Sequence, residues 1–255
     1  MKVLPMENDW QIQAKKHAIQ NVNEECCGLV LQKDDILYYL GAKNVAANKK
    51  NNFAVDPHAY LHASRSGKII ACFHSHIKNN SFSWIDINNS FKVNLPYYLY
   101  NIKKDNISCF SPVEYEQYKK YLYFKFNYGK NDCFSLIRNF YKNELDIEMS
   151  DPAQDRATKY MPPENCLIWH RQEYKEWANQ NDLVDMDVNG ISQLKKHDIL
   201  VFDGFNKGEP SHGMIYIGNE LVLHHPFNDI SKIESIRKAH FKFLKFIIRH
   251  KNVNI

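Results

Sequence analysis

The chain has 255 residues, which is enough for one large domain or for two ordinary ones that each bury a core. Hydrophobic residues make up 44% of it and the formal net charge is only +4, with lysines scattered among asparagines and acids. We therefore expect no nucleic-acid partner, because the clustered basic patch of such proteins is missing. We also expect a protein that does not span a membrane, since no apolar run approaches the ~20 residues of a spanning helix.

The N-terminus and the cysteines bear on the compartment. Residues 1–9 contain proline and acids where a signal peptide needs an apolar core, so we expect no signal peptide. The six cysteines are sparse and lie in apolar stretches, which favours reduced thiols in a protein made in a cytoplasm. No paired Cys-x-x-Cys is present, so a structural zinc ribbon has no support.

The first half predicts helices alternating with strands. Apolar residues every four positions, from Trp10 to Val22, predict an amphipathic helix from Asp9 to about Glu24. Turn residues between two apolar runs predict a hairpin of strands 28–31 and 36–40, and a short strand follows at 53–55. The remaining predicted elements are a helix begun by Asp56-Pro57 and closed by Gly67, a buried strand 68–76, a helix from Trp84 capped by Ser83, and strands 97–102 and 107–110.

The second half begins with a predicted helix at 113–124, and we place the domain border there, giving domains 1–112 and 113–255. Cys133 is expected at the front of a helix that runs to about Asn143 and is capped by Asn131 or Asp132. The stretch 151–189 has weak periodicity and gives no firm prediction. Strands are predicted at 198–202, 213–217 and 220–224.

A possible metal site lies at the end of the strand 68–76. His74 and His76 are two residues apart, so their side chains point to the same face while Ser75 faces away. Asp86, in the first turn of the next helix, can supply a third ligand and leave a fourth position for water, as in catalytic zinc sites. The alternative is a strand end with two solvent-facing imidazoles.

Three motifs occur in this order: Glu25-Cys26-Cys27-Gly28, His74-x-His76 and Ser83-x-x-Asp86. In these motifs, residues 1 to about 110 resemble the JAMM (Mov34/MPN) metalloproteases. The resemblance implies one Zn2+ held by the two histidines and Asp86, with Glu25 as general base and Ser83 bonding the oxyanion or the bound water. Two positions depart from the family.

The loop 77–82 has six residues where the family usually has seven, and Ile77 replaces the usual proline. A shorter loop is one way to shift Asp86 away from the metal, and a degenerate, metal-free JAMM fold is the alternative.

A second constellation centres on Cys133. A thiol at a helix N-terminus meets the positive end of the helix dipole, which favours the thiolate. His212 and His224 flank the turn 217–220 and face each other across a hairpin, so one imidazole can orient the other. Together they supply the nucleophile, base and orienting group of cysteine acyl transfer. The alternative is a buried, inert cysteine.

The segments 128–133, 198–202 and 212–218 resemble the NlpC/P60 cysteine peptidases, over about residues 115–250. The resemblance implies Cys133 as nucleophile, His212 as base and His224 as the third polar residue, with His225 as its near competitor.

Two positions depart from this family as well. Phe126 stands where the family often has a tyrosine that lends its hydroxyl to the oxyanion, and His197 stands where it has a glycine. Tyr128 or the backbone amide of Cys133 would then serve as the oxyanion donor.

The expected fold class is thus α+β: a JAMM/MPN-type α/β domain followed by a papain-like NlpC/P60 α+β domain. This combination resembles the tail assembly protein K group of long-tailed bacteriophages. The resemblance implies a peptidoglycan hydrolase of the virion tail tip, made in the host cytoplasm, that cleaves stem peptides and has a zinc site acting in tail assembly. Expected partners are the hub and distal tail proteins. The alternatives are a structural tail-tip component whose peptidase folds are docking modules, and a bacterial housekeeping hydrolase, which the missing signal peptide disfavours.

Overall fold

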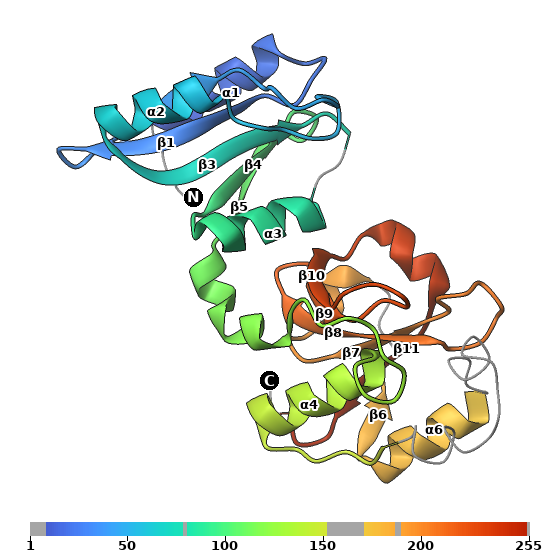
Figure 1. Ribbon diagram of the computed structural model, residues 1–255. Coiled ribbons are helices and arrows are strands. Elements are labelled where there is room, and N and C mark those ends of the chain that lie inside the picture. The colour runs from blue at the N-terminus through green and yellow to red at the C-terminus, as the bar shows by residue number, and fades with distance from the viewer. Residues whose placement is uncertain (1–8, 79–80, 152–170, 187–189, 254–255) are drawn as a thin grey trace, which may run out of the picture. The chain divides into compact units, whose positions relative to one another are not determined.

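The computed structural model describes residues 9–78, 81–151, 171–186 and 190–253 (Figure 1). The chain divides into two compact units, Met1–Gln117 and Tyr118–Ile255, and each is described by itself. The predicted domain border after residue 112 falls at the start of a 3-10 helix, η1 (Pro112–Tyr121), whereas the structure divides within it. Within the described ranges, no helix combines the length and apolarity needed to cross a bilayer.

A five-stranded sheet forms the centre of the N-terminal unit, with strand order β2-β1-β3-β4-β5. Neighbouring strands are antiparallel except β3 and β4, which are parallel and are joined through a crossover helix, α3 (Trp84–Val93). The strands are β1 (Cys27–Lys33), β2 (Ile36–Ala42), β3 (Lys68–His76), β4 (Tyr97–Asn101) and β5 (Asn106–Phe110).

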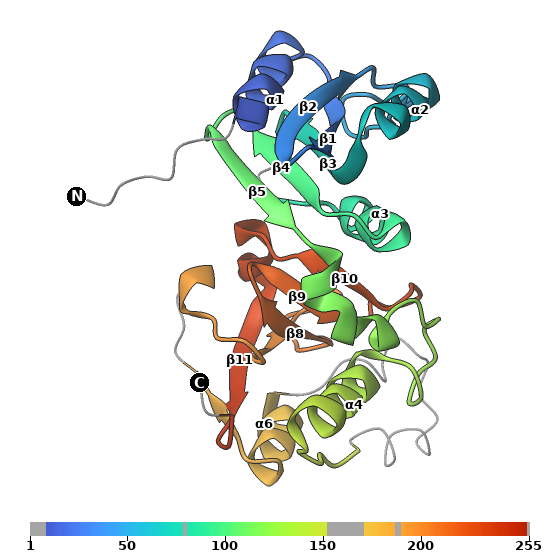
Figure 2. The same ribbon diagram turned by 90° about the vertical axis from the view of Figure 1, so that its left-hand side faces the viewer.

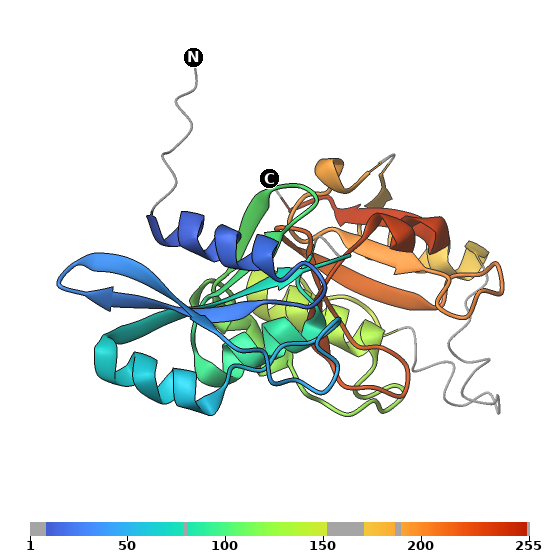
Figure 3. The same ribbon diagram turned by 90° about the horizontal axis from the view of Figure 1, so that it is seen from above.

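Helices cover both faces of this sheet (Figures 2 and 3). Helix α1 (Asp9–Gln20) lies on one face, where Trp10 packs against Tyr98 with ring centroids 4.9 Å apart. Helices α2 (Pro57–Ser66) and α3 lie on the other. Helix α2 is begun by Asp56, whose side chain accepts from the His58 amide, and is followed by Gly67, as the sequence predicts.

Two predictions for this unit need correction. The first helix ends at Gln20 rather than near Glu24, because the Asn21 side chain donates to the carbonyl of His17 and Val22 is exposed. The predicted strand 53–55 is only an isolated bridge between Val55 and Asn44. Here the side chain of Asn44 forms hydrogen bonds in place of a neighbouring strand. Its oxygen accepts from the backbone amides of Ala46 and Ala54, and its NH2 group donates to the backbone carbonyls of Glu25 and Asn52.

A six-stranded antiparallel sheet forms the C-terminal unit, with strand order β10-β9-β8-β7-β11-β6 (Figure 1). Helices α4 (Cys133–Leu145) and α6 (Arg171–Gln180) pack beside it, and α6 stacks Tyr174 on Phe246 of the sheet. The other elements are β6 (Leu183–Asp185), η2 (Ile191–Gln193), β7 (Ile199–Phe202), β8 (His212–Gly218), β9 (Leu221–His224), β10 (Lys232–Ser235), η3 (Lys238–Phe243) and β11 (Leu244–His250).

Close packing fixes α4 against β8. A Cβ atom on Gly213 would lie 2.7 Å from Cδ1 of Ile137, so a side chain at this position would require the end of the Ile137 side chain to move. The start of β7 is held by a buried ion pair, in which the guanidinium of Arg249 contacts both carboxylate oxygens of Asp198 at 2.6 and 2.8 Å. The first contact lies between α4, which begins at Cys133, and the strand that begins at His212, and the second lies within the sheet.

The predicted α-helix at 113–124 is the 3-10 helix η1, which ends at Tyr121. The following residues leave the helix because the amides of Tyr123 and Phe124 donate to the carbonyl and hydroxyl of Ser231. Most of the weakly patterned stretch 151–189 lies outside the described residues, and its described parts form α6 and β6.

Candidate active sites

The N-terminal unit brings the three predicted metal ligands together. His74 and His76 end β3 with their side chains on the face covered by α3, and Asp86 lies in the first turn of that helix. Nε2 of His74 is 3.5 Å from Oδ1 of Asp86, and Nε2 of His76 is 3.6 Å from Oδ2. All three ligand atoms lie within 4.8 Å of one another.

Ser83 holds Asp86 in place through a reciprocal capping box at the start of α3. The backbone amide and the hydroxyl of Ser83 both donate to Oδ2 of Asp86 at 2.7 Å, and the Asp86 amide donates back to the hydroxyl at 3.2 Å. Burial alone would raise the pKa of Asp86, yet the imidazole of His74 and the donors around it hold that pKa well below its usual range. The short loop 77–82 therefore does not carry Asp86 away from the histidines.

The donor set fits zinc. Both ring nitrogens of His74 are buried without a hydrogen-bond partner, and burial lowers the pKa of this imidazole, which keeps it in the neutral, metal-binding form. The nitrogen to oxygen separations of 3.5 and 3.6 Å are too long for hydrogen bonds. They are close to the edge of a tetrahedron with bonds of about 2.1 Å, which is about 3.4 Å. Phe53 stacks on His74 at 4.4 Å and supplies an apolar wall.

Glu25, immediately before β1, reaches this site, whereas Glu24 pairs with Lys49 at 3.6 Å. Oε1 of Glu25 lies 3.7 Å from Nε2 of His76. Burial raises the pKa of Glu25 to about 7, which the imidazole of His76 opposes and the carboxylate of Asp86 reinforces. A carboxyl group with such a pKa can both take up and release a proton near neutral pH.

In the C-terminal unit, Cys133 is the first residue of α4, and Asp132 is its N-cap. One oxygen of Asp132 accepts from the amide and hydroxyl of Ser135 at 2.8 and 2.7 Å, and the other accepts from the amide of Gly129 at 2.7 Å. Of the two caps that the sequence allows, the structure thus uses Asp132.

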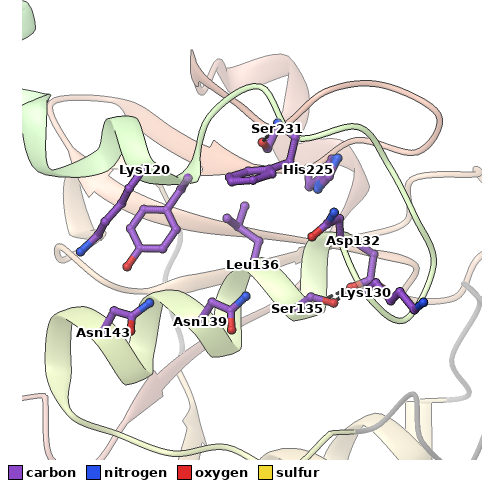
Figure 4. Close-up of a pocket in the computed structure, with 12 residues that line it drawn as sticks. Lys120, Lys130, Asp132, Ser135, Leu136, Asn139, Asn143, His225 and Ser231 are labelled. Carbon is purple, nitrogen blue, oxygen red and sulfur yellow. Dashed lines mark hydrogen bonds between the residues drawn. The ribbon is translucent and has the colours of Figure 1, made fainter.

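Figure 4 shows Asp132 and Ser135 at the wall of a cavity of about 460 Å³. Cys133 is not among the residues that line this cavity.

Cys133 and both predicted histidines line one cavity of about 430 Å³. His212 begins β8 and His224 ends β9, and the partner of His224 in the sheet is Met214, two residues after His212. Their side chains are therefore diagonal neighbours on one face, and Nε2 of His212 lies 2.8 Å from Nδ1 of His224. Aromatic side chains form much of the remaining wall, among them Phe126, Phe205 and Phe227.

The competing histidine, His225, lines the same cavity but has other contacts. Nε2 of His225 is 3.2 Å from the carbonyl of Asp229, and its ring meets the edge of Phe126 at 5.6 Å. His224, and not His225, thus contacts His212.

The expectation that the helix dipole makes Cys133 a thiolate needs correction. Burial raises the pKa of its thiol to about 12, and the adjacent Asp132 acts in the same direction, while backbone amides at the helix end oppose them. Burial also lowers the pKa of His212 to about 3, with His224 adding to the effect. At rest the site therefore holds a neutral thiol and a neutral imidazole, not the thiolate that the helix dipole alone predicts.

One acidic residue at this site was missed by sequence reasoning. Oε1 of Glu234, on β10, lies 3.0 Å from Nε2 of His224. Glu234 belongs to none of the recognised motifs, and only the alternation of apolar and polar residues in 232–235 could have indicated a strand there.

Two departures from the family pattern have visible consequences. Phe126 lines the Cys133 cavity, whereas Tyr128 is not among its lining residues, so the backbone amides of Cys133 and Phe134 beside the sulfur are the better placed oxyanion donors. His197 has φ 77°, the left-handed region that favours glycine. Its amide donates to the carbonyl of Tyr216 at 2.7 Å, which keeps this conformation at the start of β7.

Comparisons with known proteins cover both units. The family model for prokaryotic homologs of the JAB domain matches residues 8–111. Tail tip assembly protein K of Escherichia phage N15 is 24% identical over 85% of this chain and 84% of its own length. Tail tip assembly protein K of Escherichia phage lambda is 26% identical over 71% of this chain and 81% of its own length.

Among solved structures, an NlpC/P60 family protein from Bacillus cereus shares 12% identity, with a TM-score of 0.33, over 92% of this chain and 66% of that one. The family model for the NlpC/P60 family matches residues 119–249, just over half of the sequence. This range contains Cys133, His212, His224 and Glu234. The chain therefore belongs to the NlpC/P60 family.

Proposed function

We propose that this protein is a cysteine peptidase of a phage tail tip that cleaves stem peptides of peptidoglycan, with a zinc site in its N-terminal unit. The observation that carries the proposal is the arrangement of Cys133, His212 and His224 around one cavity, with the two rings 2.8 Å apart. A nucleophile, a base and a group that orients the base are the parts that acyl transfer needs.

The geometry supports a general-base mechanism. Nε2 of His212 is engaged by His224, which leaves Nδ1 of His212 to take the proton of the Cys133 thiol as the sulfur attacks the scissile carbonyl carbon. The backbone amides of Cys133 and Phe134, beside the sulfur, are the donors that we propose for the oxyanion. His212 then returns the proton to the leaving amine, a thioester remains on Cys133, and water activated by His212 hydrolyses it.

The substrate and the location follow from the family and the relatives. Two relatives that resemble most of this chain are named tail tip assembly proteins, which supports a place in the tail tip and contacts with the hub and distal tail proteins. The resemblance to the NlpC/P60 peptidases supports stem peptides as the substrate. A cavity of about 430 Å³ with a largely aromatic wall is large enough for a few residues of such a peptide.

In the N-terminal unit, His74, His76 and Asp86 would hold zinc, which when bound supplies Lewis acidity and an activated water. Ser83 orients Asp86, and its hydroxyl proton is engaged there in this structure, so a role for Ser83 at the oxyanion requires that this bond opens. Glu25 is placed to accept a proton from the attacking water and pass it to the leaving group. A peptide or protein of the assembling tail is the substrate class that we propose for this site.

The test compares two cysteine variants on purified peptidoglycan. Cys133→Ala should reduce release of soluble muropeptides from sacculi to background, whereas Cys109→Ala, which removes an exposed free thiol outside the site, should act like the unaltered protein. Equal product from all three proteins would contradict the proposal, and so would no product from any of them.

A purely structural role in the tail tip is the competing function. Tails assembled with a folded Cys133→Ala/His74→Ala double variant distinguish the two. Normal assembly combined with impaired wall opening fits catalysis, and normal tails that open the wall as well as the unaltered ones fit the structural role.

A further inference from the structure

We propose that Glu234 is a positioning residue that fixes the tautomers of both catalytic histidines, so that Nδ1 of His212, the nitrogen not engaged by His224, is free to accept a proton. This inference rests on the proposed function of the cysteine site and adds a fourth member to it. Glu234 acts through His224 and does not need to touch the substrate.

The sheet lines up the three side chains. Glu234 of β10 is paired with Val222, two residues before His224, and His224 of β9 is paired with Met214, two residues after His212. Each step is a diagonal between neighbouring strands, which keeps all three side chains on one face. The resulting contacts are 3.0 Å from Glu234 to His224 and 2.8 Å from His224 to His212.

The carboxylate of Glu234 determines which nitrogens of His224 and His212 carry protons. An ionised carboxylate only accepts hydrogen bonds, so the nitrogen facing Glu234, Nε2 of His224, must carry a proton. Nδ1 of a neutral His224 is then an acceptor, so Nε2 of His212 must be the donor in the contact between the rings. A neutral His212 with its proton on Nε2 has its lone pair on Nδ1, the nitrogen that the mechanism requires to be free.

Glu234 is the group available for this task. Nε2 of His224 is buried and has no other hydrogen-bond partner among the described residues. At rest its N–H is not well aligned with Oε1 of Glu234, so the contact is electrostatic, and such bonds often tighten only when substrate is bound. Without Glu234, nothing described in the structure would decide which nitrogen of His224 is protonated.

The charges around Glu234 keep it ionised. Burial would raise its pKa, but the nearby imidazole of His224, helped by Lys232 on β10 and His240 on η3, lowers it to about 2. Lys232 also pairs with Asp229 at 2.7 Å. The negative charge of Glu234 also favours the imidazolium that forms on His212 during attack.

The experiment combines nitrogen NMR of the two rings with kinetics. In full-length protein labelled with nitrogen-15 histidine, His212 and His224 should each show a single neutral tautomer, protonated at Nε2. Glu234→Gln, whose amide can donate as well as accept, should convert both rings to tautomer mixtures. It should lower kcat for a stem peptide by about 10- to 100-fold with KM within about twofold, because the base and not the binding site is altered. Glu220→Gln, an exposed carboxylate in the β8–β9 turn, is the matched control and should change neither readout.

Two outcomes overturn the inference. The first is a His212 ring protonated at Nδ1 in the unaltered protein, which decides the matter even if the Glu234 variant does not fold. The second is a folded Glu234→Gln protein with unchanged tautomers and kcat. The tautomer spectra do not depend on the identity of the substrate: if no peptide is cleaved by the unaltered protein, these spectra and the rate of iodoacetamide labelling of Cys133 still test the role of Glu234.

Discussion

Nε2 of His212 and Nδ1 of His224 lie 2.8 Å apart, on neighbouring strands of the C-terminal sheet. In the proposed mechanism, this contact commits one nitrogen of His212 to an orienting partner and leaves the other for the Cys133 thiol. The strand register fixes it, because the diagonal between β8 and β9 permits His224, and not His225, to reach His212.

The first prediction concerns the atom that His224 contributes. Asparagine places its carbonyl oxygen where Nδ1 of histidine lies, so His224→Asn should keep the acceptor for His212 and retain kcat within about tenfold. His224→Leu has no acceptor, and its kcat should fall by about 100-fold or more. Steady-state kinetics on a stem peptide measures both. Equal losses in the two variants would show that His224 acts by its bulk alone.

The second prediction is a pH dependence of stability caused by His212. Its pKa is lowered to about 3 in the folded chain, from about 6.5 when unfolded, so the unfolded state binds more protons between these values. The stability from this neutral ring is complete above pH 6.5 and is lost as pH falls toward 3. We expect a loss of up to about 1 kcal/mol per pH unit, below the full ~1.4, because part of the ring faces the cavity.

His212→Gln is the control for this effect, because it places an amide near the position of Nε2 but does not titrate. Denaturant unfolding of both full-length proteins from pH 6 to 4 should show a shallower decline in the variant. The other histidines with lowered pKa values are common to both proteins and drop out of the difference. Parallel curves would rule out His212 as the source of the slope.

The third prediction concerns zinc. Protein purified without chelator should contain about one zinc per chain, and His74→Ala should lose it, because two remaining ligands cannot complete a three-residue site. His62→Ala removes an exposed histidine of α2 and should leave the zinc content unchanged. Metal analysis by mass spectrometry measures all three proteins. Equal zinc in the His74 and His62 variants would place the metal elsewhere.

The fourth prediction uses the left-handed conformation of His197, with φ 77°. His197→Gly and His197→Ala both remove the ring that lies 5.6 Å from Phe140, so their difference isolates the backbone. The glycine variant should be more stable by about 1 kcal/mol, because alanine is strained in this region and glycine is not. Thermal or denaturant unfolding measures the difference. An alanine variant that is the more stable of the two would show that the backbone relaxes away from this conformation.

Local sequence rules predicted much of the fold. Asp56-Pro57 and Gly67 mark the ends of α2, and strand β3 was predicted with the bounds that the structure shows, because caps and continuous apolar runs act within a few residues. The same rules failed where contacts between residues distant in the sequence determine an element's end. The helix predicted after Pro112 ends at Tyr121 because Ser231, more than a hundred positions later, accepts hydrogen bonds from the amides of Tyr123 and Phe124.

The candidate sites divide in the same way. His74, His76, Asp86 and Cys133 were found because spacing on a strand or at a helix start determines their direction. Glu234 was not found, since its role depends on the pairing of β10 with β9, which no local pattern specifies. The neutral state of the Cys133 thiol was also missed, because burial by the assembled unit outweighs the helix dipole that the sequence suggests.

The central claim, that Cys133 is the nucleophile activated by His212, is tested most directly by trapping its acyl intermediate. Full-length protein is mixed with a stem peptide, quenched with acid within one turnover, and its mass and modified peptide are determined. The account predicts an acyl group on Cys133, absent in Cys133→Ala and greatly reduced in His212→Gln. Peptide cleavage without any adduct on Cys133, or at the same rate in Cys133→Ala, would contradict it.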